Sequence, residues 1–238
     1  MARRPTLLAS VLFVGVIVLA GCGPATPGPT GSAADRSSSP EGRMTADADA
    51  LFAAAAAGQD SAVRTLIEAG ADIEHRGEGG MTPLIAATKA NRIEAARILI
   101  EAGADVNAKD DIQDSAYLYA GARGHDEILR MTLSHGADLR STNRYGGTAL
   151  IPAAERGLID TARILLAAGV DPDHVNDLGW TALHEAIVLA DGSDRYVQMV
   201  RLLLAEGADP AVPDGDGVLP RDLAADRGYD AIVAAIDG

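Results

Sequence analysis

The stretch GTALIPAAERGLIDTARILLAAGVD, residues 147–171, decides the fold because recognisable copies of it recur along most of the chain. Each copy closes with a glycine, then an alanine or valine, then an aspartate. The closing glycines lie 33, 33, 33 and 38 residues apart, at Gly70, Gly103, Gly136, Gly169 and Gly207. A fixed period of this length indicates stacked repeat units, each of which is a helix pair with one apolar face.

Two further motifs mark the units. A T-x-L sequence opens three of them, at Thr82, Thr148 and Thr181, and the sequence GHDEI begins at residue 124 in the middle of another. Together with the closing motif, these residues resemble the ankyrin repeat. The resemblance covers residues 45–238 and implies an all-α fold with short β-hairpin fingers, an ankyrin-repeat solenoid of about six stacked helix-turn-helix units. We expect these units at residues 45–80, 81–113, 114–146, 147–179, 180–217 and 218–238, with a concave face made by the fingers and the first helices.

Some units depart from the repeat pattern. In the first unit Asp49 replaces the threonine, and we expect it to be the N-cap of the first helix. Ile112 and Gln113 stand where the turn of the third unit normally carries an acidic residue and glycine, which predicts a distorted finger. Pro152 falls inside a first helix, and we expect it near the first turn, where it costs no hydrogen bond. The fifth unit is five residues longer, and we place the extra residues around 191–195, between its helices.

Charge excludes one class of partner. The chain has 20 basic and 34 acidic residues, and removing residues 1–21 takes away two arginines and leaves 18 against 34. Nucleic acid needs a basic face that releases counterions, so we expect no nucleic-acid binding. Solubility is the simpler explanation of the acidic surface. An acidic site with a basic partner is the alternative.

The N-terminus has the pattern of a bacterial export signal. Two arginines precede an apolar run at residues 7–20, which is too short to span a membrane comfortably. The sequence LAGC that ends at Cys22 is similar to the bacterial lipobox. This similarity implies a lipoprotein signal peptide at residues 1–21 and a lipid on Cys22, which is the only cysteine. The alternative is an ordinary secretory signal followed by an incidental cysteine.

The lipid predicts where the protein is held. More than one acyl chain gives stable anchoring, so we expect the protein on the extracytoplasmic side of a bacterial cell membrane. In a cell with one membrane, this location is the outer face of the plasma membrane. In a cell with two membranes, it is the periplasm or the outer membrane. Residues 22–44 are rich in proline, glycine and serine with almost no large apolar side chain, which predicts a disordered spacer between the lipidated cysteine and the repeats.

No set of residues has the pattern of a catalytic site. The five histidines lack the spacing of a zinc-hydrolase helix, and we expect His125 and His184 to make hydrogen bonds within the framework. The DGDG run from Asp214 resembles a calcium loop only at its start, because Ala225 replaces the closing glutamate. There is no glycine-rich phosphate loop after a strand and no G-x-S-x-G elbow. We therefore expect no enzyme activity, no cofactor, no metal and no small-molecule substrate.

The candidate binding residues lie on the fingers and at the ends of the first helices. Ile112, Tyr145 and Leu178 are spaced by 33 residues, so we expect them to project at the same place in three successive fingers, and we call them the apolar ladder. Aromatic and arginine side chains are typical anchors of interfaces. The other candidates are Trp180, Arg144, Lys89, Arg123 and Arg156. Two interpretations of the ladder remain open: it binds a partner, or it packs finger against finger.

These observations predict a protein–protein interaction module. We expect a monomer that binds an unidentified envelope or secreted protein through its concave ankyrin face and is held at the membrane through the lipid on Cys22. The alternative is a structural or ligand-holding envelope protein that contacts the cell wall. An enzyme is the least favoured of the three.

Overall fold

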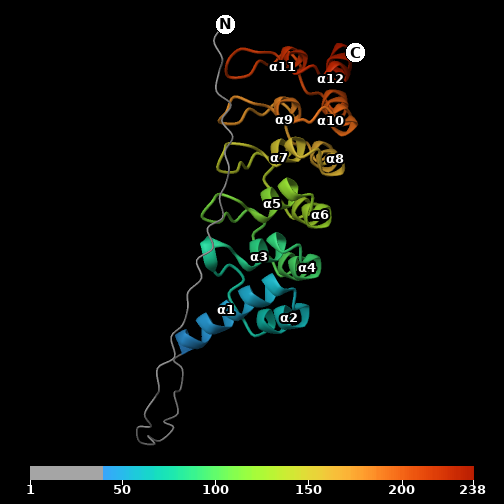
Figure 1. The fold of residues 1–238 in the computed structure, drawn as a ribbon. Coiled ribbons are helices and arrows are strands. Elements are labelled where there is room, and N and C mark those ends of the chain that lie inside the picture. The colour runs from blue at the N-terminus through green and yellow to red at the C-terminus, as the bar shows by residue number, and fades with distance from the viewer. Residues whose placement is uncertain (1–39) are drawn as a thin grey trace, which may run out of the picture. The chain divides into compact units, whose positions relative to one another are not determined.

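The computed structural model describes residues 40–238. Within that range the chain forms twelve α-helices, which follow one another as six pairs stacked one above the next (Figure 1). This arrangement confirms the predicted ankyrin-type solenoid. The predictions about the signal peptide, Cys22 and the spacer as far as residue 39 lie outside the described residues.

The helices form two columns, one of first helices and one of second helices (Figure 1). The first helices are α1 (Pro40–Ala57), α3 (Pro83–Lys89), α5 (Ala116–Arg123), α7 (Leu150–Glu155), α9 (Ala182–Val188) and α11 (Pro220–Asp226). The second helices are α2 (Asp60–Glu68), α4 (Ile93–Glu101), α6 (Asp126–Ser134), α8 (Ile159–Ala167), α10 (Asp194–Ala205) and α12 (Asp230–Asp237). The loops that precede α3, α5, α7, α9 and α11 project to one side, and we call them the fingers; a short 3-10 turn, η1 (Glu78–Gly80), lies in the first of them.

One apolar core runs along the whole stack because every pair contributes a few fully buried side chains. In the first helices, the buried position is the second residue after the opening serine or threonine, at Leu84, Tyr117, Leu150 and Leu183. In the second helices, equivalent buried positions are Leu99, Leu165 and Leu203. A single pair cannot cover its own apolar stripe, so stability comes from the contacts between neighbouring pairs.

The start of each first helix depends on its opening residue. Thr82 and Ser115 cap α3 and α5, because each side-chain oxygen accepts the backbone N–H three residues later, at 3.3 and 3.2 Å. Thr148 does not cap α7, which begins at Leu150, and the Thr148 hydroxyl has no hydrogen-bond partner among the described residues. Pro152 is the third residue of α7 and therefore lies in the first turn, as expected, where a backbone N–H has no partner within the helix.

The fingers contain no β-strand within residues 40–238, so the predicted β-hairpins are wrong. Each finger turn is closed by two backbone hydrogen bonds, for example from the Asn143 N–H to the Gly147 carbonyl at 2.9 Å and from the Gly146 N–H to the Asn143 carbonyl at 3.0 Å. These bonds form a turn and not the repeated pairing of two strands.

The predicted distortion of the finger before α5 is also wrong. The Asp110 N–H donates to the Asp114 carbonyl at 2.9 Å, which is the same closure that the next finger makes. Gln113 keeps this closure by adopting a φ of 66°, where the next finger has Gly146 at 71°. The left-handed region is unfavourable for a residue with a Cβ. Gln113 therefore adopts a strained backbone conformation, and the finger keeps the same turn.

The first helix is longer than expected. Helix α1 begins at Pro40, so residues 40–44, assigned to the disordered spacer by their composition, are helical. Asp49 lies in the interior of α1 and is not an N-cap. Its carboxylate instead accepts a hydrogen bond from His75 Nε2 at 2.8 Å. The chain between these two residues turns back so that His75 reaches the helix, which no local pattern indicates.

The extra residues of the fifth unit were expected around residues 191–195, between its helices. The loop between α9 and α10 covers residues 189–193, whereas residues 194 and 195 are the first two of α10, which has 12 residues. The last unit covers this loop. The Tyr229 hydroxyl donates to the Ala190 carbonyl at 2.8 Å, and a Cβ on Gly192 would lie 3.1 Å from the Tyr229 ring. The insertion is therefore packed against the C-terminal pair.

Candidate functional site

The apolar ladder projects from three successive fingers. Ile112, Tyr145 and Leu178 are 45%, 56% and 60% exposed, so all three lie outside the continuous core. These exposures do not fit the interpretation in which the three side chains pack finger against finger.

A side-chain turn fixes the backbone of each ladder residue. Asn143 Oδ1 accepts the N–H of Tyr145 at 2.9 Å, and Asn176 Oδ1 accepts the N–H of Leu178 at 3.0 Å. Asp110 Oδ1 accepts the N–H of Ile112 at 3.1 Å. Asparagine and aspartate favour such turns because their short side chains reach the backbone two residues on. The ladder therefore stands on fixed backbone even though its side chains meet water.

Two neighbouring cavities lie between the fingers and the first helices, and Tyr145 lines both of them. The first cavity, of about 340 Å³, is lined by Trp180, Leu178 and the carboxylate residues Glu155 and Glu185, and we call it the Trp180 cavity. The second, of about 230 Å³, is lined by Ile112, Arg123, Arg144 and Arg156, and we call it the arginine cavity. All the sequence-predicted candidates except Lys89 line one cavity or the other.

Glu185 is the most perturbed acid of the Trp180 cavity. Glu185 is only 6% exposed, and its Oε1 accepts a hydrogen bond from Asn176 Nδ2 at 3.1 Å. Burial, and secondly the nearby charge of Glu155, raise the pKa of Glu185 to about 7, although the Asn176 hydrogen bond lowers it. Among residues 40–238, neither Glu155 nor Glu185 has a salt-bridge partner.

The arginine cavity has the opposite balance of charge. The Arg144 guanidinium lies 4.6 Å from the centre of the Tyr145 ring, and Arg123 lies 5.5 Å from the centre of the Tyr119 ring. Burial and the charge of Asp110 raise the pKa of Asp114 in this cavity, while Lys89, Arg144 and Arg123 lower it. Two of the three arginines, Arg123 and Arg144, are thus held over aromatic rings.

Lys89 is the candidate that the structure does not bring to the cavities. Its Nζ lies 2.7 Å from Asp110 Oδ2, and the Asp110 side chain is only 1% exposed. Asp110 also holds the turn of the finger before α5, so Lys89 neutralises a buried framework carboxylate. Removing one partner of such a pair would leave a buried charge uncompensated, so Lys89 stabilises the framework. Its Nζ also lies 5.5 Å from the centre of the Tyr119 ring, which lines the arginine cavity.

The Trp180 cavity and the arginine cavity together form a groove between the fingers and the first helices. Three residues of this groove were not predicted from the sequence, although the repeat period could have identified them. Tyr119, Pro152 and Glu185 each lie four residues after the opening serine or threonine, and they are spaced by 33 residues. All three line the cavities. The fourth residue of the opening turn therefore faces the groove in successive units, just as the ladder position does in successive fingers.

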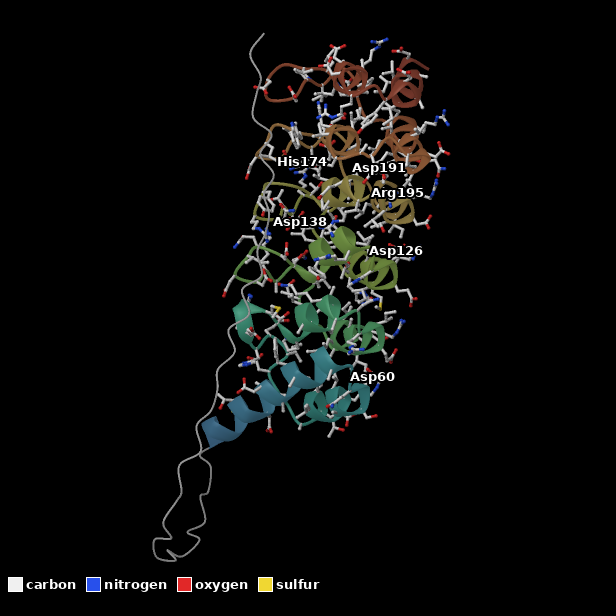
Figure 2. All side chains as sticks on the ribbon, in the orientation of Figure 1. Asp60, Asp126, Asp138, His174, Asp191 and Arg195 are labelled. Carbon is white, nitrogen blue, oxygen red and sulfur yellow. The ribbon has the colours of Figure 1, made fainter. Side chains whose placement is uncertain are left out.

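The histidines have framework contacts, as expected for His125 and His184. His125 Nδ1 donates to the Thr88 carbonyl at 3.0 Å, and His184 Nδ1 accepts the Thr181 N–H at 3.1 Å. His174 lies among the fingers, where its Nε2 donates to the Gly146 carbonyl at 2.7 Å (Figure 2). Within residues 40–238, no group of three or more histidine, cysteine, aspartate or glutamate side chains is placed to hold a metal ion. None of the helices in this range combines the length and apolar character needed to cross a membrane.

Comparisons with known proteins agree with this architecture. The family described as "Ankyrin repeats (3 copies)" matches residues 34–110 and 117–214, which is more than half of the chain. The chain is similar to the crystal structure of an ankyrin repeat domain from Acinetobacter baumannii AYE, with 57% identity and a TM-score of 0.77 over 78% of this chain and 95% of that one. It is also similar to the ankyrin repeat protein EF0377, with 42% identity and a TM-score of 0.77 over 80% and 97% of the two chains. A search of curated proteins found no match.

The stacked helix pairs and the groove along their fingers define a helical repeat protein of the class that presents an extended binding surface. The chain belongs to the ankyrin repeat family. Ankyrin repeats are protein–protein interaction modules, and proteins built from them are generally scaffolds without enzyme activity. A protein partner is the ligand class that this family membership indicates.

Proposed function

We propose that this protein is a lipid-anchored interaction module on the extracytoplasmic side of a bacterial membrane, where it binds an envelope or secreted protein through the groove between its fingers and first helices. The observation that carries the binding role is the apolar ladder, whose exposed side chains stand on turns that hydrogen bonds hold fixed. Loops on a rigid scaffold are where binding residues concentrate. The anchoring role rests on the LAGC sequence that ends at Cys22.

The composition of the groove suits a protein ligand. Tyr145, Trp180 and the arginines Arg123, Arg144 and Arg156 are the residue types that dominate interface energetics. Tyr145 lies between the two cavities and is the middle member of the ladder, so flanking contacts would exclude water there. We therefore assign the centre of the interface to Tyr145.

Site-directed photo-crosslinking tests this function in living cells. A photoreactive phenylalanine analogue would replace Tyr145 or Leu178 in the groove, or Glu127 or Arg163 on exposed parts of the second helices α6 and α8 as matched controls. We expect one discrete protein adduct from the groove positions and none from the controls. Adducts only with wall glycan, or equal adducts from all four positions, would contradict binding of a protein partner through this groove.

A further inference from the structure

The Trp180 cavity combines aromatic walls with acidic groups. Tyr145, Leu178 and Trp180 supply apolar and aromatic surface, while Glu155 from α7 and Glu185 from α9 supply carboxylates. No lysine, arginine or histidine lines this cavity within residues 40–238. A volume of about 340 Å³ is enough for one long side chain and lies at the low end of the range for small-molecule sites.

The two carboxylates of this cavity carry an electrostatic cost that the described chain does not offset. Glu185 is almost completely buried, and its one hydrogen-bond donor is the neutral Asn176 side chain. Glu155 faces the same space without a salt-bridge partner in residues 40–238. A buried carboxylate without a cationic partner takes up a proton, unless a ligand of opposite charge stabilises its ionised form. The cavity is therefore complementary to a cation that also has a surface for aromatic contact.

The arginine cavity, on the other side of Tyr145, selects the opposite charge. Three arginines line it, at positions 123, 144 and 156, against the two carboxylates of Asp114 and Glu155. Arginine forks recognise carboxylates with two parallel hydrogen bonds. Two adjacent cavities of opposite preference would bind one segment that carries both charges.

We propose that the Trp180 cavity binds an arginine side chain of the partner protein, while an acidic side chain of the same extended segment occupies the arginine cavity. This proposal rests on the proposed function and specifies the chemistry of its ligand. Arginine suits the site better than lysine because the planar guanidinium stacks on aromatic rings, is more weakly hydrated, and bonds carboxylates in a fork.

The repeat geometry sets the spacing of the two side chains. Stacked helices lie about 8 to 10 Å apart, so neighbouring cavities are separated by about that distance. A segment in the extended polyproline II conformation advances about 3.1 Å per residue and completes a turn every three residues, so an acidic residue and an arginine three positions apart lie on the same side at about this distance. A segment with this spacing would lay its backbone along the apolar ladder.

Fluorescence of Trp180 offers a direct test, because the chain contains a single tryptophan. The full chain, purified in detergent micelles, would be titrated with capped peptides that hold an aspartate and an arginine three residues apart, in both orders. Matched peptides would carry lysine or citrulline in place of arginine; citrulline has the same shape without the charge. We expect a saturable change in emission with the arginine peptide of one order, and at least tenfold weaker binding of the citrulline peptide.

Variants of the carboxylates separate this site from general attraction to an acidic protein. The double variant Glu155→Gln with Glu185→Gln should weaken binding of the arginine peptide at least tenfold, whereas Glu127→Gln on α6 should leave it unchanged. Arg144→Gln should weaken binding of the aspartate-containing peptide and not of the same peptide with asparagine. Circular-dichroism melts would show that the variants are folded, because Gln at 185 removes a buried charge and should not lower the melting temperature.

Three outcomes would overturn the proposal: equal binding of the citrulline and arginine peptides, no response to any peptide, or binding that survives the double Gln variant. A self-association that this variant abolished, measured by sedimentation, would also overturn it by placing a second copy of the chain in the groove. If the crosslink from position 145 to a discrete protein persisted in any of these cases, the interaction function would stand and only the arginine assignment would fail.

Discussion

The N–H of Asp177 donates to the carbonyl of Tyr145 at 3.0 Å, so the finger before α9 holds the backbone of the ladder residue in the finger before α7. The same residue is tied within its own finger by Asn143. Hydrogen bonds to the main chain of Tyr145 therefore position it, while the residue is more than half exposed. Binding and stability are separable at this residue.

Truncation of Tyr145 should affect binding and not folding. We expect Tyr145→Ala to weaken binding of the partner by about 2 kcal/mol or more, as at the centre of other interfaces. The same change should alter the free energy of unfolding by less than about 1 kcal/mol. Tyr145→Phe, which keeps the ring, is the control and should lose much less affinity. A denaturant melt of each variant gives the stability, and a loss as large as about 3 to 5 kcal/mol would mean that the ring is packed as core.

The raised pKa of Glu185 predicts how stability depends on pH. The folded state keeps a proton on Glu185 up to about pH 7, whereas the unfolded chain releases it near the ordinary value of 4.5. Between these values the folded state binds more protons, so the contribution of Glu185 to the free energy of unfolding falls as pH rises. Each pKa unit corresponds to about 1.4 kcal/mol. Urea melts between pH 5 and pH 8 should therefore show that Glu185→Gln gains stability relative to the parent as pH rises; a difference that does not change with pH would disprove the shift.

Removing the hydroxyl of Tyr117 should stabilise the fold. It is fully buried at a position where other units have leucine, and its hydroxyl has no hydrogen-bond partner among the described residues. An unsatisfied buried group costs about 1 to 3 kcal/mol, so Tyr117→Phe should raise the free energy of unfolding by about 1 kcal/mol.

Tyr196 is the matched control for this change. It is also buried, but its hydroxyl donates to the Glu155 carbonyl at 2.8 Å. Tyr196→Phe should lower the free energy of unfolding by about 1 kcal/mol. Chemical denaturation of both variants checks the pair, and changes of the same sign would show that the partnering of the hydroxyl does not decide the outcome.

Gln113 is a site for stabilisation. Its φ of 66° lies in the left-handed region, which costs a residue with a side chain about 1 to 2 kcal/mol relative to glycine. The greater freedom of glycine in the unfolded chain offsets part of this gain. We expect Gln113→Gly to raise the melting temperature, whereas the reverse change at the equivalent position, Gly146→Gln, should lower it, since a Cβ there would also meet the Asp177 carboxylate.

Lipid attachment is tested at Cys22. We expect Cys22→Ala to abolish labelling by a radioactive or clickable fatty acid and to leave the precursor unprocessed or the protein released from membranes. Cell fractionation and metabolic labelling measure both effects. Normal membrane retention of the variant together with normal processing would contradict the lipoprotein assignment.

The sequence by itself determined the parts of this protein that repeat. A period of 33 residues is a local pattern, and in a stack each unit meets only its neighbours, so the pattern predicts the solenoid, its units and the alignment of Ile112, Tyr145 and Leu178. The place of Pro152 in a first turn follows from the same alignment. The histidine contacts of His125 and His184 are likewise repeated framework features.

Tertiary structure alone decided what depends on distances between units. The pairing of Lys89 with Asp110 and the shared cavity of Glu155 and Glu185 join residues on different elements. Whether a carboxylate is buried, and which charge it meets, is set by the direction of side chains across a stacking interface, because desolvation and Coulomb interactions act through space. The period could therefore show which residues recur, but only the assembled stack shows that an acidic and a basic cavity adjoin at Tyr145.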